Sequence, residues 1–294
     1  MPELPEVETV RIGLSQLLPG KTIISVWHDN AKSFPNAEAD VEQFLIGAKV
    51  LEVKRRAKVL LIELDSKYTL VTHLKMTGQM VFRGPNDRFG AGHPNDSLLG
   101  DLPDKSTRVI FDFDDDSKFF FNDFRKFGWV RLIPTAEVPM IDFFRKVGPE
   151  PLSADFTPEV FRQRIKKRAR TNIKAAILDQ TTLAGVGNIY ADESLWMARI
   201  HPLSLVGNLS AQKLNRLHEA IREVLQLSID KGGSSDKNYV DAEGRRGSYL
   251  AFANVFRREG KPCTRCGTTI LKTRVAGRGT HICPKCQRLL SRAS

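Results

Sequence analysis

Two Cys-x2-Cys pairs lie near the end of the sequence: Cys263-Thr264-Arg265-Cys266 and Cys283-Pro284-Lys285-Cys286, with sixteen residues between them. They contain all four cysteines of the 294-residue chain. Each pair forms a knuckle that presents two thiolates, and two knuckles complete a tetrahedral Zn²⁺ site. Four cysteine ligands leave no open position on the metal, so we predict one structural zinc ion. A redox dithiol is the alternative.

The segment around the cysteines is strongly basic. Residues 255–294 hold three lysines, seven arginines and one glutamate, so they carry +9 of the chain's net charge of +11. Such a concentration predicts a polyanionic partner, and a solubilising basic tail is the alternative. Between the cysteine pairs, Arg278 stands between Gly277 and Gly279. A guanidinium in such a turn is suited to bidentate contact with phosphate, although a solvated turn arginine has the same pattern.

A glycine turn lies in the middle of the chain, in Leu183-Ala184-Gly185-Val186-Gly187-Asn188-Ile189-Tyr190. The two glycines allow a tight turn between helices, and Asn188 can cap the second helix. Free N–H groups at a helix start attract phosphate. A basic run at residues 162–170 precedes the turn and favours phosphate binding. The alternative is that the turn is only architecture and the run a solvated face.

The N-terminus reads Met1-Pro2-Glu3-Leu4-Pro5-Glu6-Val7-Glu8. Met before Pro is normally removed, which leaves Pro2 as a secondary amine at the start of a helix. A free α-amine has a pKa of about 7.7–8.0, and the positive end of a helix dipole lowers it. Such an amine can attack a sugar C1′ and form a Schiff base, with Glu3 beside it for acid–base work. The alternative is that Pro2 merely starts a helix whose dipole Glu3 and Glu6 complement.

Hydrophobic periodicity predicts an α+β multidomain protein. Residues 2–18 form an amphipathic helix. Short runs rich in Val, Ile and Phe predict an antiparallel sandwich or barrel. These runs are Thr22–Trp27, Lys49–Val53, Val59–Leu64, Thr69–His73, Gln79–Phe82, Val109–Phe113, Lys118–Phe121 and Gly128–Leu132. The Gly- and Pro-rich stretch 84–104 between them is interpreted as a mobile loop.

Beyond a linker at Gly148-Pro149-Glu150-Pro151 the pattern becomes helical, with helices predicted over 157–168, 173–178, 189–198 and 210–230. A polar, Gly-rich stretch at 232–249 follows. We therefore expect three domains, at 1–149, 150–252 and 253–294. No apolar run reaches the roughly 18 residues of a membrane helix, and the acidic N-terminus is not a secretory signal. We expect a cytoplasmic protein that has no membrane partner.

Together these motifs resemble the bacterial formamidopyrimidine-DNA glycosylase family over the whole chain. The opening octapeptide resembles the family's N-terminal signature. Residues 180–190 resemble its helix-two-turn-helix element, and residues 263–286, with Val275-Ala276-Gly277-Arg278-Gly279-Thr280, resemble its zinc finger. The resemblance implies an N-terminal helix with an antiparallel β-sandwich, a helical helix-two-turn-helix domain and a C-terminal zinc finger. It also favours the nucleophile interpretation of Pro2.

The resemblance implies roles for individual residues. Pro2 is the nucleophile, Glu3 its acid–base partner, and Glu6 helps to hold the helix. Lys58 contacts DNA near the lesion and belongs to the catalytic set with Arg278. Asn188 and Arg278 clamp phosphates around a nucleotide that is flipped out of the duplex. Three further residues fill the vacated space and meet the orphaned base: Met76, Arg125 and Phe127.

The chain departs from the family pattern at three places. Many relatives have a His-rich motif where this chain has Lys105-Ser106-Thr107-Arg108, so Lys105 and Arg108 are expected to replace its phosphate contacts. Phe256 stands where relatives often have Tyr, and residues 84–104 look longer than usual. None of these positions belongs to the proposed chemistry.

The resemblance implies a monomeric bifunctional glycosylase/AP lyase that excises oxidised purines from damaged double-stranded DNA. An endonuclease VIII-like relative for oxidised pyrimidines is one alternative. Leu4, the Met76/Arg125/Phe127 set and the long 232–249 stretch argue against it. A non-catalytic binder of damaged DNA is the other, and the presence of both Pro2 and Glu3 argues against that.

Overall fold

The computed structural model describes residues 2–93, 96–234 and 249–289. The chain divides into two compact units, residues 1–145 with 231–248 and residues 146–230 with 249–294. The polar stretch predicted at 232–249 lies mostly outside the described residues. Among the described residues, no helix is long and apolar enough to cross a bilayer.

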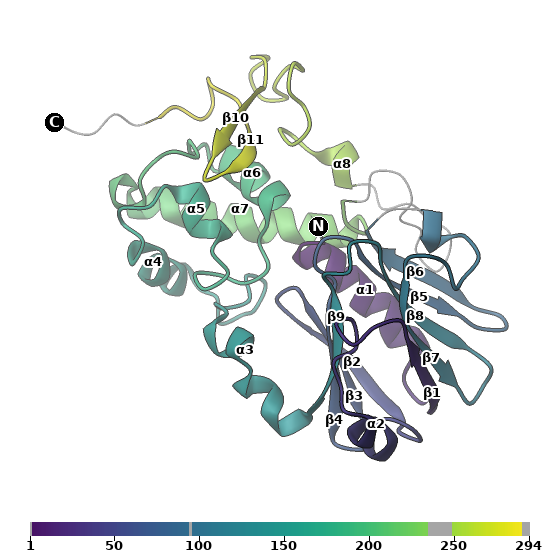
Figure 1. The fold of residues 1–294 in the computed structure, drawn as a ribbon. Coiled ribbons are helices and arrows are strands. Elements are labelled where there is room, and N and C mark those ends of the chain that lie inside the picture. Colours follow the sequence, from purple (N-terminus) through teal and green to yellow (C-terminus); the bar gives the residue numbers. More distant parts are fainter. Residues whose placement is uncertain (1, 94–95, 235–248, 290–294) are drawn as a thin grey trace. The chain divides into compact units, whose positions relative to one another are not determined.

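The first unit contains two antiparallel sheets (Figure 1). The five-stranded sheet has the order β1-β7-β8-β5-β6, and the four-stranded sheet has the order β2-β3-β4-β9. The strands are β1 (Ile23–His28), β2 (Val50–Arg56), β3 (Val59–Leu64), β4 (Tyr68–His73), β5 (Gly78–Arg83), β6 (Arg88–Gly92), β7 (Thr107–Phe113), β8 (Lys118–Asp123) and β9 (Trp129–Pro134). The predicted α+β class with an antiparallel sandwich is therefore confirmed, and eight of these strands lie where the sequence predicts them.

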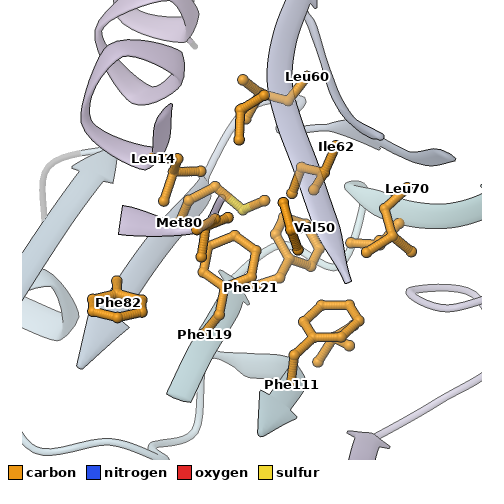
Figure 2. Packing of buried hydrophobic residues seen from close by; sticks show 14 of the residues in the cluster. Leu14, Val50, Leu60, Ile62, Leu70, Met80, Phe82, Phe111, Phe119 and Phe121 are labelled. Atoms are coloured by element: carbon orange, nitrogen blue, oxygen red, sulfur yellow. The ribbon is translucent and has the colours of Figure 1, made fainter. Parts of the chain in front are cut away.

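Helix α1 (Leu4–Leu17) completes the core of this unit. Its apolar residues recur at helical spacing, and Val7, Val10 and Leu14 are all fully buried. Figure 2 shows Leu14 beside side chains from both sheets. The helix thus packs one apolar face against the core, and this packing provides most of the helix's stability.

Strand β6 corrects the interpretation of residues 84–104 as a mobile loop. Arg88–Gly92 pairs with β5 along its whole length, with Phe82 opposite Phe89. Leu98, in the short helix η1 (Asp96–Leu98), packs with Val81 and Phe120 on the outer face of the sheet. Arg83 donates hydrogen bonds to the carbonyls of Phe89 and Leu98 and ties the segment together. The described parts of the stretch, residues 84–93 and 96–104, thus extend the sheet and pack on it.

The remaining short helices of this unit lie at its edges and were not predicted, because they have too few residues to show a period. They are α2 (Glu38–Phe44), η2 (Thr135–Met140) and α3 (Asp142–Lys146), the last of which ends at the division between the units.

The second unit contains the helices and a two-stranded hairpin. The four helices predicted from periodicity are present, with every end within two residues of the expected one. The elements are α4 (Pro158–Lys166), α5 (Ile173–Leu178), α6 (Asn188–Met197), η3 (Val206–Asn208), α7 (Ala211–Asp230), α8 (Tyr249–Phe252), β10 (Leu271–Val275) and β11 (Arg278–Ile282). Side-chain caps begin two of them: Thr157 accepts the N–H of Val160, and Asn172 accepts that of Ala175.

A prediction follows from the contact between α1 and β6. A Cβ added to Gly13 would lie 2.1 Å from the ring of Phe89. Alanine normally favours a helix over glycine by about 1 kcal/mol. Here we expect Gly13→Ala to lower the free energy of unfolding by about 1–3 kcal/mol, because the ring has to move within a packed core. Urea unfolding measures the change.

Gln16→Ala is the matched control, since Gln16 is exposed on the same helix. Combining Gly13→Ala with Phe89→Leu should recover part of the loss, because the smaller side chain relieves the clash. A Gly13→Ala protein that is more stable than wild type would show that the ring does not restrict this position.

Candidate functional site

The head of α1 holds the proposed nucleophile and its partner in a buried, capped position. Pro2 precedes the helix and is buried, and Glu3 is its N-cap residue with 4 % of its surface exposed. The carboxylate of Glu6 accepts the N–H of Glu3 at 2.8 Å and that of Ser234 at 2.9 Å. Glu6 therefore fixes the first turn of α1, as the family resemblance implies.

Lys58 and His73 lie side by side at the ends of two paired strands. Lys58 is buried in the turn before β3, and the next residue, Val59, pairs with His73 of β4. The Nδ1 atom of His73 accepts the N–H of Lys75 at 3.0 Å. Burial, and then the charges of Lys75 and Lys58, lower the pKa of His73 to about 3. Sequence analysis missed His73, because a lone histidine at a strand end carries no pattern.

The three residues expected to fill the duplex are brought together. Met76 is exposed, and its Sδ atom lies 3.0 Å from Nη1 of Arg125. The Arg125 guanidinium lies 5.0 Å from the centre of the exposed Phe127 ring. Cation–π contact of this kind helps to order both side chains.

Asp123, at the end of β8, holds the turn that carries Arg125 and Phe127. It is fully buried, and its carboxylate accepts the N–H groups of Arg125 (3.2 Å), Phe127 (2.8 Å) and Gly128 (2.6 Å), together with the hydroxyl of Thr77. The same carboxylate thus links the Met76 turn to the Arg125 turn. Sequence analysis gave no role to Asp123.

Lys105 and Arg108 differ in exposure, and therefore in their ability to contact DNA. Lys105 is exposed, with its ammonium 5.9 Å from the ring centre of Phe124. Arg108 is buried, and its guanidinium donates to the carbonyls of Asp123 and Lys105 and to the carboxylate of Asp29. We therefore do not expect Arg108 to contact phosphate, because its buried guanidinium donates to groups of the protein itself.

Asn188 and Arg278 come together in the second unit, although 89 residues separate them in the chain. Asn188 begins α6, and its side-chain amide donates to the carbonyl of Gly279 at 3.0 Å. Arg278 begins β11 and is exposed beside this contact. The hairpin thus presents its guanidinium next to the start of a helix, where anions bind favourably.

A buried ion pair holds this hairpin against the helices. Lys174 of α5 and Asp192 of α6 are fully buried, and their charged groups are 2.6 Å apart. The Lys174 ammonium also donates to Oγ1 of Thr280 at 2.7 Å and to the carbonyl of Gly279 at 3.1 Å. Asp192 accepts the N–H of His281 at 2.9 Å. Both charges are thereby satisfied by strand β11, which makes their burial tolerable.

The four cysteines form the metal centre. Their sulfurs all lie within 4.8 Å of one another, with Cys266 and Cys283 at 3.4 Å. Tetrahedral Zn–S bonds of about 2.3 Å require sulfurs about 3.8 Å apart, so the donor set fits zinc. The protein thus holds one structural zinc ion, as predicted. The indole N–H of Trp196 points at Cys263 Sγ at 3.4 Å and joins the centre to α6.

Glu193 connects α6 to the segment that leads into the zinc centre. It is buried, and its carboxylate accepts the N–H groups of Asn254, Val255 and Phe256 at 2.8–2.9 Å. Burial raises the pKa of Glu193, and these hydrogen bonds act in the opposite direction. Phe256 contacts the ring of His281 edge to face.

Comparison with protein families gives three matches in chain order. Residues 1–130 match the formamidopyrimidine-DNA glycosylase N-terminal domain, residues 147–239 match the formamidopyrimidine-DNA glycosylase H2TH domain, and residues 260–289 match a zinc finger found in FPG and IleRS. These matches, with the geometry above, define a DNA glycosylase that is built on two antiparallel sheets, a helix-two-turn-helix element and a zinc finger.

Individual relatives agree with this class. The formamidopyrimidine-DNA glycosylase of Pediococcus pentosaceus is 41% identical over 98% of this chain and 100% of its own. A mutant of the Lactococcus lactis enzyme, solved with Fapy-dG containing DNA, has a TM-score of 0.86 and 36% identity over 98% of this chain and 100% of its own. MutM in complex with carbocyclic 8-oxo-G containing DNA has a TM-score of 0.84 and 35% identity, over 98% and 100% respectively. The chain belongs to the formamidopyrimidine-DNA glycosylase family.

A pH prediction follows from His73. Its pKa in the folded state lies below its unfolded value of about 6.5, so the unfolded chain gains the proton first as the pH falls. The stability that the neutral ring provides is therefore fully present above pH 6.5 and is lost between pH 6.5 and about 3. At about 1.4 kcal/mol per pH unit, wild type should lose about 2 kcal/mol relative to His73→Phe between pH 7 and pH 5.

Urea unfolding at both pH values measures this difference in the free energy of unfolding, and the exposed His28→Gln is the control. Parallel pH dependences for wild type and His73→Phe would contradict it.

A second prediction concerns the metal. Cys283→Ser removes one of four ligands, so we expect loss of zinc and of the hairpin that carries Arg278, while the first unit keeps its fold. A chromophoric chelator measures zinc, and fluorescence anisotropy measures duplex affinity. Thr269→Ser, an exposed non-ligand near the first cysteine pair, should retain both. Normal duplex affinity after verified zinc loss would count against a role for the finger in binding.

Proposed function

We propose that this protein is a bifunctional glycosylase/AP lyase that excises oxidised purines, 8-oxoguanine and formamidopyrimidines, from double-stranded DNA in base-excision repair. The observation that carries the proposal is the buried, capped head of α1 with Pro2 and Glu3, in a chain of this family. Lesion-containing DNA in the complexes of its relatives supports the substrate class. The endonuclease VIII-like alternative would instead act on oxidised pyrimidines, so these are the substrates to compare with oxidised purines.

The chemistry begins at the nitrogen of Pro2 after removal of Met1. Its lone pair attacks C1′, the bond from C1′ to the base breaks, and the base leaves with the electron pair and gains a proton. Loss of the N–H proton and opening of the sugar ring give an iminium between Pro2 and C1′. Proton losses from the opened sugar then drive β- and δ-elimination. A one-nucleotide gap is the expected product.

Glu3 is placed for proton transfer at the sugar ring, because it is the N-cap residue directly after Pro2. A carboxyl group in this position can donate to the ring oxygen as the sugar opens. General acid–base catalysis of this kind contributes about a hundred- to ten-thousand-fold.

We infer that Lys58, Asn188 and Arg278 bind phosphates around the flipped nucleotide, with Lys105 as an additional surface contact. Met76, Arg125 and Phe127 enter the space that the nucleotide leaves, which their mutual contacts and exposure support. His73 joins this set through its place beside Lys58. Arg108 is left out, since its guanidinium is buried and donates to Asp123, Lys105 and Asp29.

The domain boundaries that we propose are those of the sequence, 1–149, 150–252 and 253–294. The matches to residues 1–130 and 147–239 support a boundary in this region, and the zinc centre and α6 share one compact unit. We also propose that the enzyme acts as a monomer in the bacterial cytoplasm, at the nucleoid, because its relatives are bacterial enzymes that act on DNA.

Borohydride trapping tests the nucleophile. Borohydride reduces an iminium to a stable amine, so wild-type protein should become covalently joined to an 8-oxoguanine duplex. Peptide mapping should place the adduct on Pro2. Glu3→Gln should keep its affinity and lose base excision by about a hundred- to ten-thousand-fold. Glu38→Gln, an exposed carboxylate on α2, is the control.

A protein that retains Met1 or carries an acetylated terminus should not trap, because its first nitrogen is then an amide. Trapping by such a blocked protein would assign the nucleophile to a lysine, with Lys58 the first candidate. Faster strand cleavage on thymine-glycol than on 8-oxoguanine duplexes would favour the endonuclease VIII-like alternative.

A further inference from the structure

Strand β6 is followed by a histidine, His93, whose position bears on the proposed nucleophile. Side chains alternate between the two faces of a strand, so residues two apart share a face. Phe89 and Ala91 point into the core of the first unit, where Phe89 meets Gly13 of α1. His93 directly follows β6, beyond Gly92, whose φ of +125° ends the regular alternation of the strand.

The chain from Phe89 to His93 is about as long as the helix from Gly13 back to Glu3. From Phe89 to His93 the chain advances about 13 Å, at about 3.3 Å per residue. From Gly13 back to Glu3 the helix spans about 15 Å, at 1.5 Å per residue. Phe89 meets Gly13, and its cross-strand partner Phe82 lies under the ammonium of Lys21, just past the end of α1, so β6 runs toward the start of the helix as it approaches His93.

Hydrogen bonds fix the backbone of His93 to the turn that carries Met76. Its N–H donates to the carbonyl of Gly78 at 3.0 Å, and its carbonyl accepts from Nε2 of the buried Gln79 at 2.5 Å. Gly92 has φ +125°, and a Cβ there would lie 2.5 Å from the Gly78 carbonyl oxygen, so only glycine allows this approach. The backbone of His93 is thus fixed beside the start of β5, directly after the turn that carries Met76.

The electrostatics of His93 agree with this placement. Partial burial lowers the pKa of His93, the positive charge at the N-terminus of the chain lowers it further, and Asp123 acts in the opposite direction. An imidazole that is neutral at neutral pH has a nitrogen free to accept a hydrogen bond or a proton.

We propose that His93 is a further catalytic residue, the hydrogen-bond and proton acceptor for the nitrogen of Pro2. This inference rests on the proposed function, in which Pro2 is the nucleophile. A neutral secondary amine has one N–H and one lone pair, so an acceptor that holds the N–H also directs the lone pair. Attack on C1′ gives a tertiary ammonium that still carries this proton. The proton moves to the imidazole, the nitrogen lone pair then forms the C=N bond, and the ring oxygen leaves with the electrons of its bond to C1′ and is protonated.

Single-turnover trapping on an 8-oxoguanine duplex tests this assignment. We expect His93→Ala to slow borohydride trapping by about ten- to a hundred-fold, within the range of general base catalysis. Its affinity for a duplex with an uncleavable abasic analogue should stay within about twofold of wild type. Added imidazole should restore a large part of the rate, because a free base can occupy the vacated space. His93→Gln should stay slow and gain nothing from imidazole, since its amide accepts a hydrogen bond but takes no proton and fills the space.

Asp87→Asn, an exposed position in the same added segment, is the matched control and should trap like wild type with or without imidazole. Trapping by His93→Ala at the wild-type rate would overturn the assignment of His93 alone. So would a slow variant that imidazole does not restore, because that result indicates a structural role. Absence of a Pro2 adduct in the wild-type protein would instead overturn the proposed function and this inference with it.

Discussion

Buried carboxylates that accept backbone N–H groups organise this molecule. Glu6 holds the first turn of α1, Asp123 holds the turn that carries Arg125 and Phe127, and Glu193 holds the segment before the zinc centre. A charged acceptor makes a stronger hydrogen bond than a neutral one, and burial strengthens it further. Each carboxylate thereby fixes a stretch of irregular chain, which regular secondary structure cannot do.

The proposed chemistry imposes the same need for rigidity. A nucleophile at a chain terminus would normally be mobile, since end residues are poorly ordered unless they are tied down. Here the helix that follows Pro2 has Val7, Val10 and Leu14 fully buried between two sheets, and β6 covers a further part of it. The catalytic geometry is therefore a property of the sandwich core as much as of the residues at its edge.

Sequence patterns predicted most of the architecture, and their failures have physical causes. Strongly periodic helices and Val-, Ile- and Phe-rich strands were found, and so was the zinc centre, because four thiolates at this spacing have few other uses. Strand β6, Arg-Phe-Gly-Ala-Gly, was missed because glycines hide its alternation, and its partner Gly13 lies far away in the sequence. Lys174 looked like an ordinary helix residue, since the strand that buries its charge lies about a hundred residues later. His73 and Asp123 act through neighbours that only the folded sheet brings near them.

The ion pair of Lys174 and Asp192 limits how this zinc finger can be exchanged between related proteins. Strand β11 supplies the hydroxyl, carbonyl and N–H groups that satisfy both buried charges. Without that strand the helices would be left with two desolvated charges that lack part of their hydrogen bonding, and without the helices the hairpin would lose the surface that orients it. The finger is therefore not an interchangeable module. A chimera that exchanges it has to carry α5 and α6 along, and substitutions at Lys174, Asp192 and Thr280 are expected to be accepted only in matched combinations.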